Sequence, residues 1–381
     1  MGLTESFAVP QHDDEPTFPA ADPVILLASP GPMGPALRAA LREPDRVAVP
    51  RLLDRLIYHR VDGLAWRAIA SLPPEEIDPW LRATLRRRHQ QRAAAALAQG
   101  LALCEVLERL DRAGVPVAVM RGLRAIEWIY KDAGARPFED HDLLIRPEDE
   151  AGARAVLEAL EYDEVTSGLF RRTTVSIDLH TDPIGARRRP TRARLLPIDV
   201  PALFREARPG WVAGGPALLL SPEDDLILLA LHVVKHSFDR LIRTADLAHI
   251  IAAHGTALCW EAVRDKAEMA RALRLVGLAL GASEMLGVSP PAPVRLADPA
   301  RGLEGLLLRR ARDLRPLPYG GEVLMALAAP RFIDRLLFIL DAMAPRGESR
   351  TVGRATAGLS RRAVVLLDGA ARQVRERRQA R

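Results

Sequence analysis

Residues 138–145 read Phe-Glu-Asp-His-Asp-Leu-Leu-Ile, and this stretch indicates both a fold and a site. The apolar run that closes it is typical of a buried strand. Residues two apart in a strand point to the same face, so Asp140 and Asp142 project together while His141 points the other way. Two adjacent carboxylates repel each other, and a divalent cation between them makes the arrangement favourable. The stretch therefore predicts a strand that carries a cation site.

The segments around this strand predict an α+β core with a small mixed β-sheet. A short apolar run precedes Arg121-Gly122, which turns the chain into a helix. Apolar residues at helical spacing favour another helix over 148–160. The strands that we expect are 116–120, 138–145, 169–172 and 174–180.

Helical regions are expected on both sides of the sheet. Leu52, Leu53 and Leu56 recur at the spacing of one buried helix face. Ser221 and Pro222 are a typical N-cap and first helical residue. The predicted regions are a disordered leader (1–22), an N-terminal helical region (23–113), the α/β core (114–210), a helical region that lines the substrate or nucleotide (217–290) and a C-terminal helical extension with a basic tail (291–381).

Composition narrows the class of protein. Hydrophobic content of 48% with 27% charged residues is that of a globular chain. The net charge of +5 suits a partner that carries phosphates, but the Arg-rich runs lack interleaved aromatic residues, so nucleic acid is not an expected partner. The two cysteines, Cys104 and Cys259, lack metal-ligand spacing, and no secretory signal or membrane-length apolar run occurs. We therefore expect a cytoplasmic protein without a membrane span.

Asp178 is the candidate for a third acid. It lies in the expected strand 174–180, and an acid on a neighbouring strand would complete a two-cation site. Asp178 could also serve as the base that takes a hydroxyl proton. His180 shares its strand face and could bind substrate or a phosphate oxygen. Mg²⁺ is the expected cation, with Mn²⁺ as the alternative.

An acid-x-acid sequence alone is more often a surface turn than a cation site. Two features favour the site. The acids precede an apolar run and so lie on a strand. Arg121-Gly122 and Arg136-Pro137 also bring guanidinium and backbone N–H groups within reach of phosphates.

His232 and His236 are four residues apart on an expected helix and share a face. Such a pair can bind zinc, but no third ligand is apparent, which favours a structural or substrate-lining role. Lys235 and Arg240 lie nearby and could contact a triphosphate or acceptor. An ion-paired helix surface is the alternative for these two cations.

The order of these motifs resembles the uncharacterised bacterial nucleotidyltransferase family of the polymerase-beta-like superfamily. Members have a strand that ends in Lys-Gly, an Arg-Pro loop, an Asp-x-Asp strand and a later strand with an acid, Leu and His. The matching positions are Arg121-Gly122, Arg136-Pro137, Asp140-His141-Asp142 and Asp178-Leu179-His180. The resemblance extends from about Leu52 to about Leu286. It implies a mixed sheet between helical regions, Mg²⁺, and transfer of a nucleoside monophosphate from a nucleoside triphosphate to a small-molecule, peptide or protein hydroxyl.

Two departures from the family pattern leave an alternative open. Arg121 replaces the usual Lys, and His141 replaces an aliphatic residue. The Gly-Ser helix start of the superfamily is also missing, as expected for this family, which makes nucleotide binding less secure than metal binding. The alternative is a catalytically inactive binding or accessory protein with the same fold. A Ser hydrolase or a P-loop enzyme is not supported, because neither a Gly-x-Ser-x-Gly elbow nor a phosphate-binding Gly-rich loop occurs.

Overall fold

The computed structural model describes residues 22–31, 38, 41, 49–185, 190–295, 302–315, 319–329 and 331–343. Residues 1–21 of the expected leader, the Arg187–Arg189 run and the basic tail lie outside the described residues.

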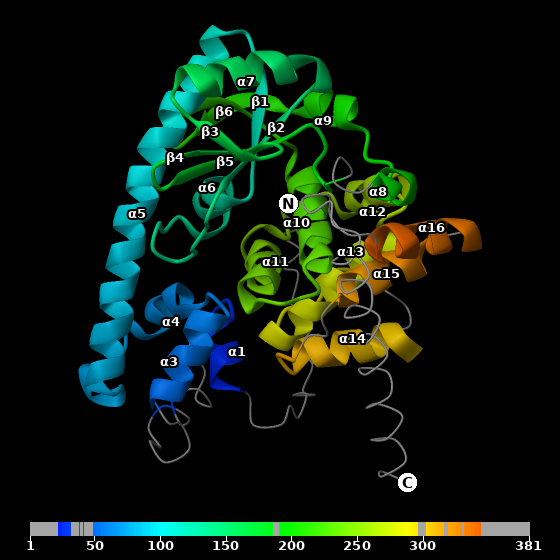
Figure 1. The fold of residues 1–381 in the computed structure, drawn as a ribbon. Coiled ribbons are helices and arrows are strands. Elements are labelled where there is room, and N and C mark those ends of the chain that lie inside the picture. The colour runs from blue at the N-terminus through cyan, green and yellow to red at the C-terminus, as the bar shows by residue number, and fades with distance from the viewer. Residues whose placement is uncertain are drawn as a thin grey trace, which may run out of the picture.

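A seven-stranded mixed sheet forms the centre of the α+β fold (Figure 1). Its strand order is β3-β4-β5-β2-β1-β7-β6. The β2–β5 and β1–β7 pairs are parallel, and the other neighbouring pairs are antiparallel. The strands are β1 (Val117–Met120), β2 (His141–Ile145), β3 (Asp163–Thr166), β4 (Leu169–Arg172), β5 (Val175–His180), β6 (Arg208–Val212) and β7 (Gly215–Leu219).

The sheet is larger than the sequence predicted. Strand β2 begins at His141 rather than at residue 138, so Asp140 lies in the bend that precedes it. Strand β3 was missed because all its residues are exposed and give no apolar alternation. The β6–β7 hairpin was also missed, and Leu218-Leu219 continues a strand instead of opening a helical region. Its turn is Ala213-Gly214, both at positive φ, a two-residue connection that joins antiparallel strands.

Side chains alternate between two faces of the sheet, and this decides where the polar groups lie. Leu143 and Ile145 of β2 belong to the core beneath the helices α5 (Pro79–Arg112) and α7 (Glu150–Ala159), whereas Leu144 belongs to a smaller cluster on the other face. Asp142 shares the face of Leu144 because the two are two residues apart. His141 points toward the α5 side and is 1% exposed.

A 34-residue helix, α5, connects the N-terminal helices to the sheet (Figure 1). It begins at Pro79 after Asp78, whose side chain accepts a hydrogen bond from the Leu81 N–H group. The N-terminal elements are α1 (Pro23–Ala28), α3 (Val49–Tyr58), α4 (Asp62–Ile69), η1 (Pro74–Glu76) and α5 (Pro79–Arg112). Leu52, Leu53 and Leu56 of α3 are buried as predicted.

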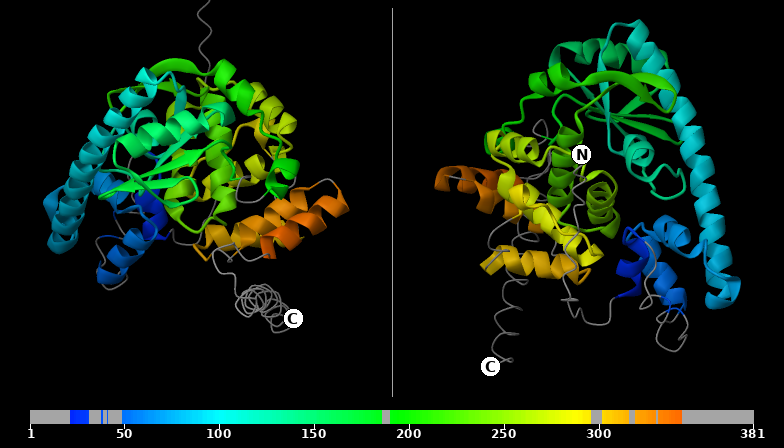
Figure 2. Two further views of the ribbon diagram at one scale, coloured as in Figure 1. Left: turned by 45° about the horizontal axis from the view of Figure 1, so that its top comes forward. Right: turned by 180° about the vertical axis from the view of Figure 1, so that it is seen from behind.

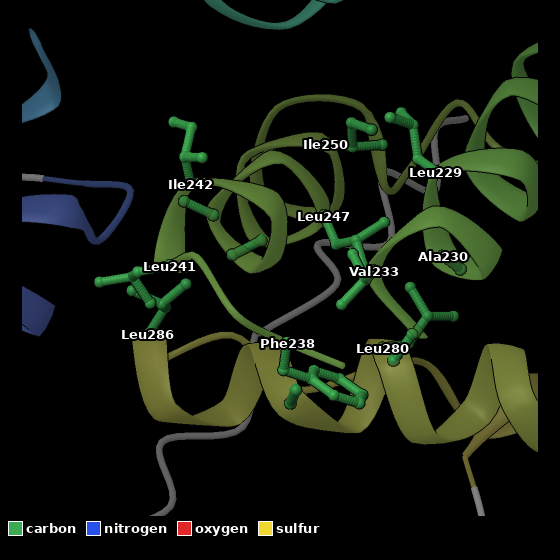
Figure 3. Close-up of a cluster of buried hydrophobic side chains, with 14 of the residues drawn as sticks. Leu229, Ala230, Val233, Phe238, Leu241, Ile242, Leu247, Ile250, Leu280 and Leu286 are labelled. Atoms are coloured by element: carbon green, nitrogen blue, oxygen red, sulfur yellow. The ribbon is translucent and has the colours of Figure 1, made fainter. Parts of the chain in front are cut away.

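Helix α10 lies under the polar face of the sheet and begins with the predicted signal, since Ser221 caps it and Pro222 is its first residue. Figure 3 shows its apolar side chains packed against α11 and the helical segment that ends at Leu286. These elements are α10 (Pro222–Lys235), α11 (Leu241–His254), α12 (Trp260–Met269), α13 (Leu273–Gly281) and η4 (Ala282–Leu286).

The last helices, α15 and α16, lie on the opposite side of the molecule from α5 in every view (Figures 1 and 2). The remaining elements are α6 (Gly122–Ala125), the π-helix η2 (Ile126–Tyr130), η3 (Pro147–Asp149), α7 (Glu150–Ala159), α8 (Thr191–Leu195), α9 (Val200–Glu206), η5 (Ala292–Val294), α14 (Gly302–Arg312), α15 (Gly320–Ala328) and α16 (Phe332–Met343). Among the helices of the described ranges, none has both the length and the apolar character needed to cross a membrane.

Candidate active site

Three neighbouring strands bring the candidate residues to one place on the polar face of the sheet. In the parallel pair β2–β5, Asp142 lies opposite Asp178. In the antiparallel pair β1–β2, Met120 lies opposite Asp142, so Arg121 follows β1 at the same level. His180 is two residues beyond Asp178 and shares its face.

The His180 imidazole lies between two carboxylates. Its Nε2 atom is 2.8 Å from Asp142 Oδ1 and 3.3 Å from Asp178 Oδ2. One ligand atom from each of these three residues lies within 4.8 Å of the other two. Asp140 lines the same cavity from the bend before β2. The set of atoms is chemically suited to a divalent cation, because carboxylate oxygen and imidazole nitrogen are both metal ligands.

The two acids of the Asp-x-Asp sequence differ in their proton affinity. Burial and, after it, the charge of Asp142 raise the pKa of Asp140 to about 6. Burial would also raise the pKa of Asp142, but Arg121 and His180 together hold that pKa well below its usual range. Asp142 is therefore fully ionised at neutral pH, and Asp140 takes up a proton in mildly acidic solution.

Arg121 contacts the carboxylate of Asp142 with two nitrogens. Its Nε donates to Oδ2 at 2.8 Å, and Nη2 donates to Oδ1. Its Nη1 lies 3.2 Å from His232 Nδ1, so the guanidinium joins the sheet to α10. The Arg121 backbone has φ 54° and ψ −146°, a conformation that L residues rarely adopt and that costs about 1–3 kcal/mol.

A cavity of about 320 Å³ separates these groups from a basic wall on the helices. Lys235 comes from α10, Arg243 from α11 and Arg192 from α8. Arg192 is 4% exposed and donates to the Ile184 carbonyl oxygen at 3.2 Å. The cavity thus has the three acids and Arg121 on the sheet side, and Lys235, Arg243 and Arg192 on the helical side.

His232 and His236 line the cavity between the two walls, with ring centroids 4.4 Å apart. Burial and the nearby Arg243 lower the pKa of His236 to about 3, and burial and Arg121 lower the pKa of His232 well below its ordinary value. Both rings are therefore neutral at pH 7. Among the described residues, the group of potential metal ligands consists of Asp142, Asp178 and His180, and it does not include His232 or His236.

Residues 45–287 match the family model for an uncharacterised nucleotidyltransferase. This is more than half of the chain and includes every residue of the acidic and basic walls. The chain belongs to this nucleotidyltransferase family. The resemblance inferred from the motifs is thereby confirmed, and nucleotidyl transfer is the general chemistry assigned. No curated protein and no solved structure matches the chain.

The Arg-Pro loop of the chain is held by a buried ion pair. Arg136 Nε lies 2.9 Å and 3.0 Å from the two Asp246 oxygens, and the Tyr130 hydroxyl donates to Asp246 Oδ1 at 2.7 Å. Arg136 and Asp246 are 8% and 1% exposed. Arg136 thus lines the cavity while its guanidinium is bound to a buried carboxylate. This buried pair holds Arg136, and with it the Arg-Pro turn, against α11.

Arg240 and Gly122 were both predicted to bind the nucleotide, but only Gly122 lines the cavity. Arg240 does not line the cavity, because its Nη1 donates to the Tyr58 carbonyl oxygen at 2.6 Å and its guanidinium lies 3.8 Å from the centroid of the Tyr58 ring. Gly122 does line it, and a Cβ there would lie 3.4 Å from the Asp140 carbonyl oxygen. Its φ of +42° also favours glycine.

No sequence pattern pointed to Arg60, Arg192 or Arg243, all of which line the cavity. Arg192 follows the Arg-rich run and reads as part of a charged loop. Arg243 is three residues after Arg240, but Arg240 precedes α11 in an extended conformation and contacts Tyr58, whereas Arg243 lies in the first turn of the helix. If the start of α11 at Leu241 had been known, the helical spacing of its residues could have indicated Arg243 as a residue of the cavity wall.

Proposed function

We propose that the chain transfers a nucleoside monophosphate from a nucleoside triphosphate to a hydroxyl of a small molecule, peptide or protein. The observation that carries this proposal is the two-sided cavity, in which Asp140, Asp142 and Asp178 face Lys235 and other cations of the helices. A triphosphate needs cationic donors for its oxygens, and a cation held by carboxylates can bind the same phosphates from the other side. The two free cysteines are consistent with a reducing cytoplasm.

The carboxylates fit Mg²⁺, which takes one or two carboxylates together with substrate phosphates, and Mn²⁺ is the alternative. Asp140, Asp142 and Asp178 are the side chains that would hold the cation. When bound, the cation would offset the negative charge of the phosphate that accepts the attack and of the leaving group.

In the proposed reaction the acceptor oxygen attacks the α-phosphorus of the triphosphate. The bond between this phosphorus and the bridging oxygen to the β-phosphate breaks, and pyrophosphate leaves with the bonding electron pair. The hydroxyl proton of the acceptor passes to a carboxylate oxygen of Asp178. Lys235 and Arg121 line the same cavity and would donate charge-assisted hydrogen bonds to the triphosphate.

The test is a label-transfer assay with nucleoside triphosphates labelled on the α-phosphate and a cell extract as the source of acceptor. We expect label to remain on the acceptor, and Asp178→Asn to reduce the rate by roughly 10²–10⁴-fold, as for loss of a general base. Asp142→Asn should abolish transfer. Asp163→Asn is the matched control, because Asp163 is an exposed acid on the edge strand β3 of the same sheet.

A parallel reaction with the γ-phosphate labelled distinguishes the reaction class. Transfer of the γ-label instead of the α-label would show phosphoryl transfer and overturn the proposal. So would wild-type rates in Asp142→Asn or Asp178→Asn.

One observation favours a second candidate, a catalytically inactive binding or accessory protein. Arg121 donates to both oxygens of Asp142 and so competes with a cation for that ligand. Calorimetry with each common nucleoside triphosphate and Mg²⁺ tests this candidate. Binding without transfer in any extract, or no binding of any of the nucleotides, would favour it.

A further inference from the structure

The placement of His180 bears on which cation the site selects. The parallel register of β2 and β5 sets Asp142 opposite Asp178 and Leu144 opposite His180. The His180 side chain nevertheless reaches back along the sheet, so that its Nε2 lies 2.8 Å and 3.3 Å from oxygens of the two acids. The His180 side chain is 11% exposed, so it is largely buried beside the two carboxylates.

The group with ligand atoms within 4.8 Å of one another consists of two oxygens and one nitrogen. The Asp-x-Asp sequence suggested an oxygen-only set that included Asp140, but the converging atoms are those of Asp142, Asp178 and His180. Mg²⁺ binds oxygen ligands almost exclusively, whereas imidazole nitrogen is a ligand for first-row transition metals. Mn²⁺ is a first-row transition metal that also accepts the carboxylate and water ligands of Mg²⁺.

We propose that His180 is a direct cation ligand with Asp142 and Asp178, and that this mixed site selects Mn²⁺ over Mg²⁺. Mn²⁺ would then be the cation of the proposed nucleotidyl transfer. The proposal rests on that function only because both assign Asp142 and Asp178 to the cation. Asp140, which lies outside the converging group, is left for the nucleotide-bound cation.

Arg121 leaves room for such a ligand set. Its guanidinium occupies one side of the Asp142 carboxylate, while Oδ1 also faces His180 Nε2 on the other. A carboxylate has about four lone-pair positions, so two Arg121 contacts do not exhaust them. Asp178 and His180 both lie on β5, and β2 separates that strand from β1, which Arg121 follows.

The test uses the full chain without nucleotide and Mn²⁺ itself as the probe. Electron spin-echo spectroscopy of bound Mn²⁺ detects a directly coordinated ¹⁴N nucleus. We expect nitrogen modulation in the wild type and its loss in His180→Gln. His236→Gln is the matched control, since His236 lines the same cavity and should leave the modulation unchanged.

Binding titrations give the second readout. Loss of a residue that only supports a ligand costs roughly 10–100-fold in metal affinity, so His180→Gln should weaken Mn²⁺ binding by at least about tenfold. Mg²⁺ affinity should change much less, because Mg²⁺ gains little from the nitrogen. His180→Asp, which restores an oxygen ligand, should raise Mg²⁺ affinity relative to Mn²⁺.

Several results would overturn the proposal: bound Mn²⁺ without nitrogen modulation in the wild type, modulation that persists in His180→Gln, or an unchanged preference in His180→Asp. The wild-type spectrum decides the question even if the variants fold poorly. Failure of nucleotidyl transfer is a separate outcome, because nitrogen coordination is measured without nucleotide. Nitrogen modulation in a chain that transfers no nucleotide would reject the proposed function and retain the site.

Discussion

The guanidinium of Arg121 pairs with both carboxylate oxygens of Asp142, with Nε 2.8 Å from Oδ2 and Nη2 in contact with Oδ1. The family pattern expected Lys at this position, which would present one ammonium group rather than a planar fork. The pair is 6% and 13% exposed at its side chains, so both charges are largely removed from water. A buried pair of this kind depends strongly on both partners.

Replacement of Arg121 should therefore make the fold depend on a cation. We expect Arg121→Met to destabilise the chain in the presence of a chelator by about 3 kcal/mol, because Asp142 is left as an uncompensated buried charge. Divalent cations should then stabilise the variant more than they stabilise the wild type. Thermal unfolding with and without Mn²⁺ measures both effects.

The same variant should weaken triphosphate binding, since it removes a cation from the cavity. Arg121→Lys is the control, because it keeps the charge and should lie between the two proteins. An equal shift in melting temperature with Mn²⁺ in the wild type and Arg121→Met would contradict competition between Arg121 and the cation.

The buried pair beneath the Arg-Pro loop should be essential for stability. Asp246→Ala should destabilise the fold by about 3–5 kcal/mol, because it leaves Arg136 buried without its counterion. Tyr130→Phe removes one hydrogen bond to a charged group and should cost about 1.5–3 kcal/mol. Urea denaturation measures both. Glu108→Gln breaks the exposed pair with Arg112 and should change the free energy of unfolding by less than about 1 kcal/mol.

Stability should fall as pH is lowered from about 6.5 to about 4, and His59 is one cause. His59 is buried, with 5% of the residue exposed. Burial and, after it, the charge of Arg55 lower the pKa of His59 from 6.5 to about 4. Between these values the unfolded chain binds a proton that the folded chain does not, so the contribution is fully present above pH 6.5 and is lost below it. The loss from this residue alone is up to about 3 kcal/mol.

Denaturation midpoints at several pH values check this expectation. His59→Phe removes the titrating group and should flatten the curve between pH 6.5 and pH 4. The same slope in both proteins would show that the pKa of His59 does not change on folding.

The contact between α15 and α10 should affect both stability and binding. Gly321 N donates to Ser237 Oγ at 2.8 Å, and a Cβ at Gly321 would lie 1.8 Å from the Val234 carbonyl oxygen. Gly321→Ala must therefore displace α15 from the end of α10, where Lys235 and His236 lie. We expect a loss of about 1–3 kcal/mol in stability, as for an overpacked core, together with weaker triphosphate binding.

Gly281→Ala is the matched control, because no atom lies within 4 Å of its added Cβ and the position ends a helix. It should leave stability unchanged or raise it by up to about 1 kcal/mol. Normal triphosphate affinity in Gly321→Ala would show that α15 supports the fold alone and not the basic wall.

The sequence by itself determined the polar and apolar faces of the central strand. Period-2 alternation is a local property, so Asp142 and His141 had to lie on opposite faces of β2 whatever surrounded them. The caps of α5 and α10 were equally local, since Asp78 and Ser221 bond to backbone groups within three residues. The Asp-x-Asp motif and the later Asp178 were likewise found because each belongs to a short continuous stretch.

Only the tertiary structure decided which of these groups meet. The register that sets Asp142 opposite Asp178, the pairing of Arg121 with Asp142 and that of Arg136 with Asp246 all join residues at least 21 positions apart. Local spacing carries no information on such contacts. Arg243 lines the cavity in place of Arg240 for the same reason: Arg240 precedes α11 in an extended conformation and donates to the Tyr58 carbonyl oxygen 182 positions away, whereas Arg243 lies in the first turn of α11.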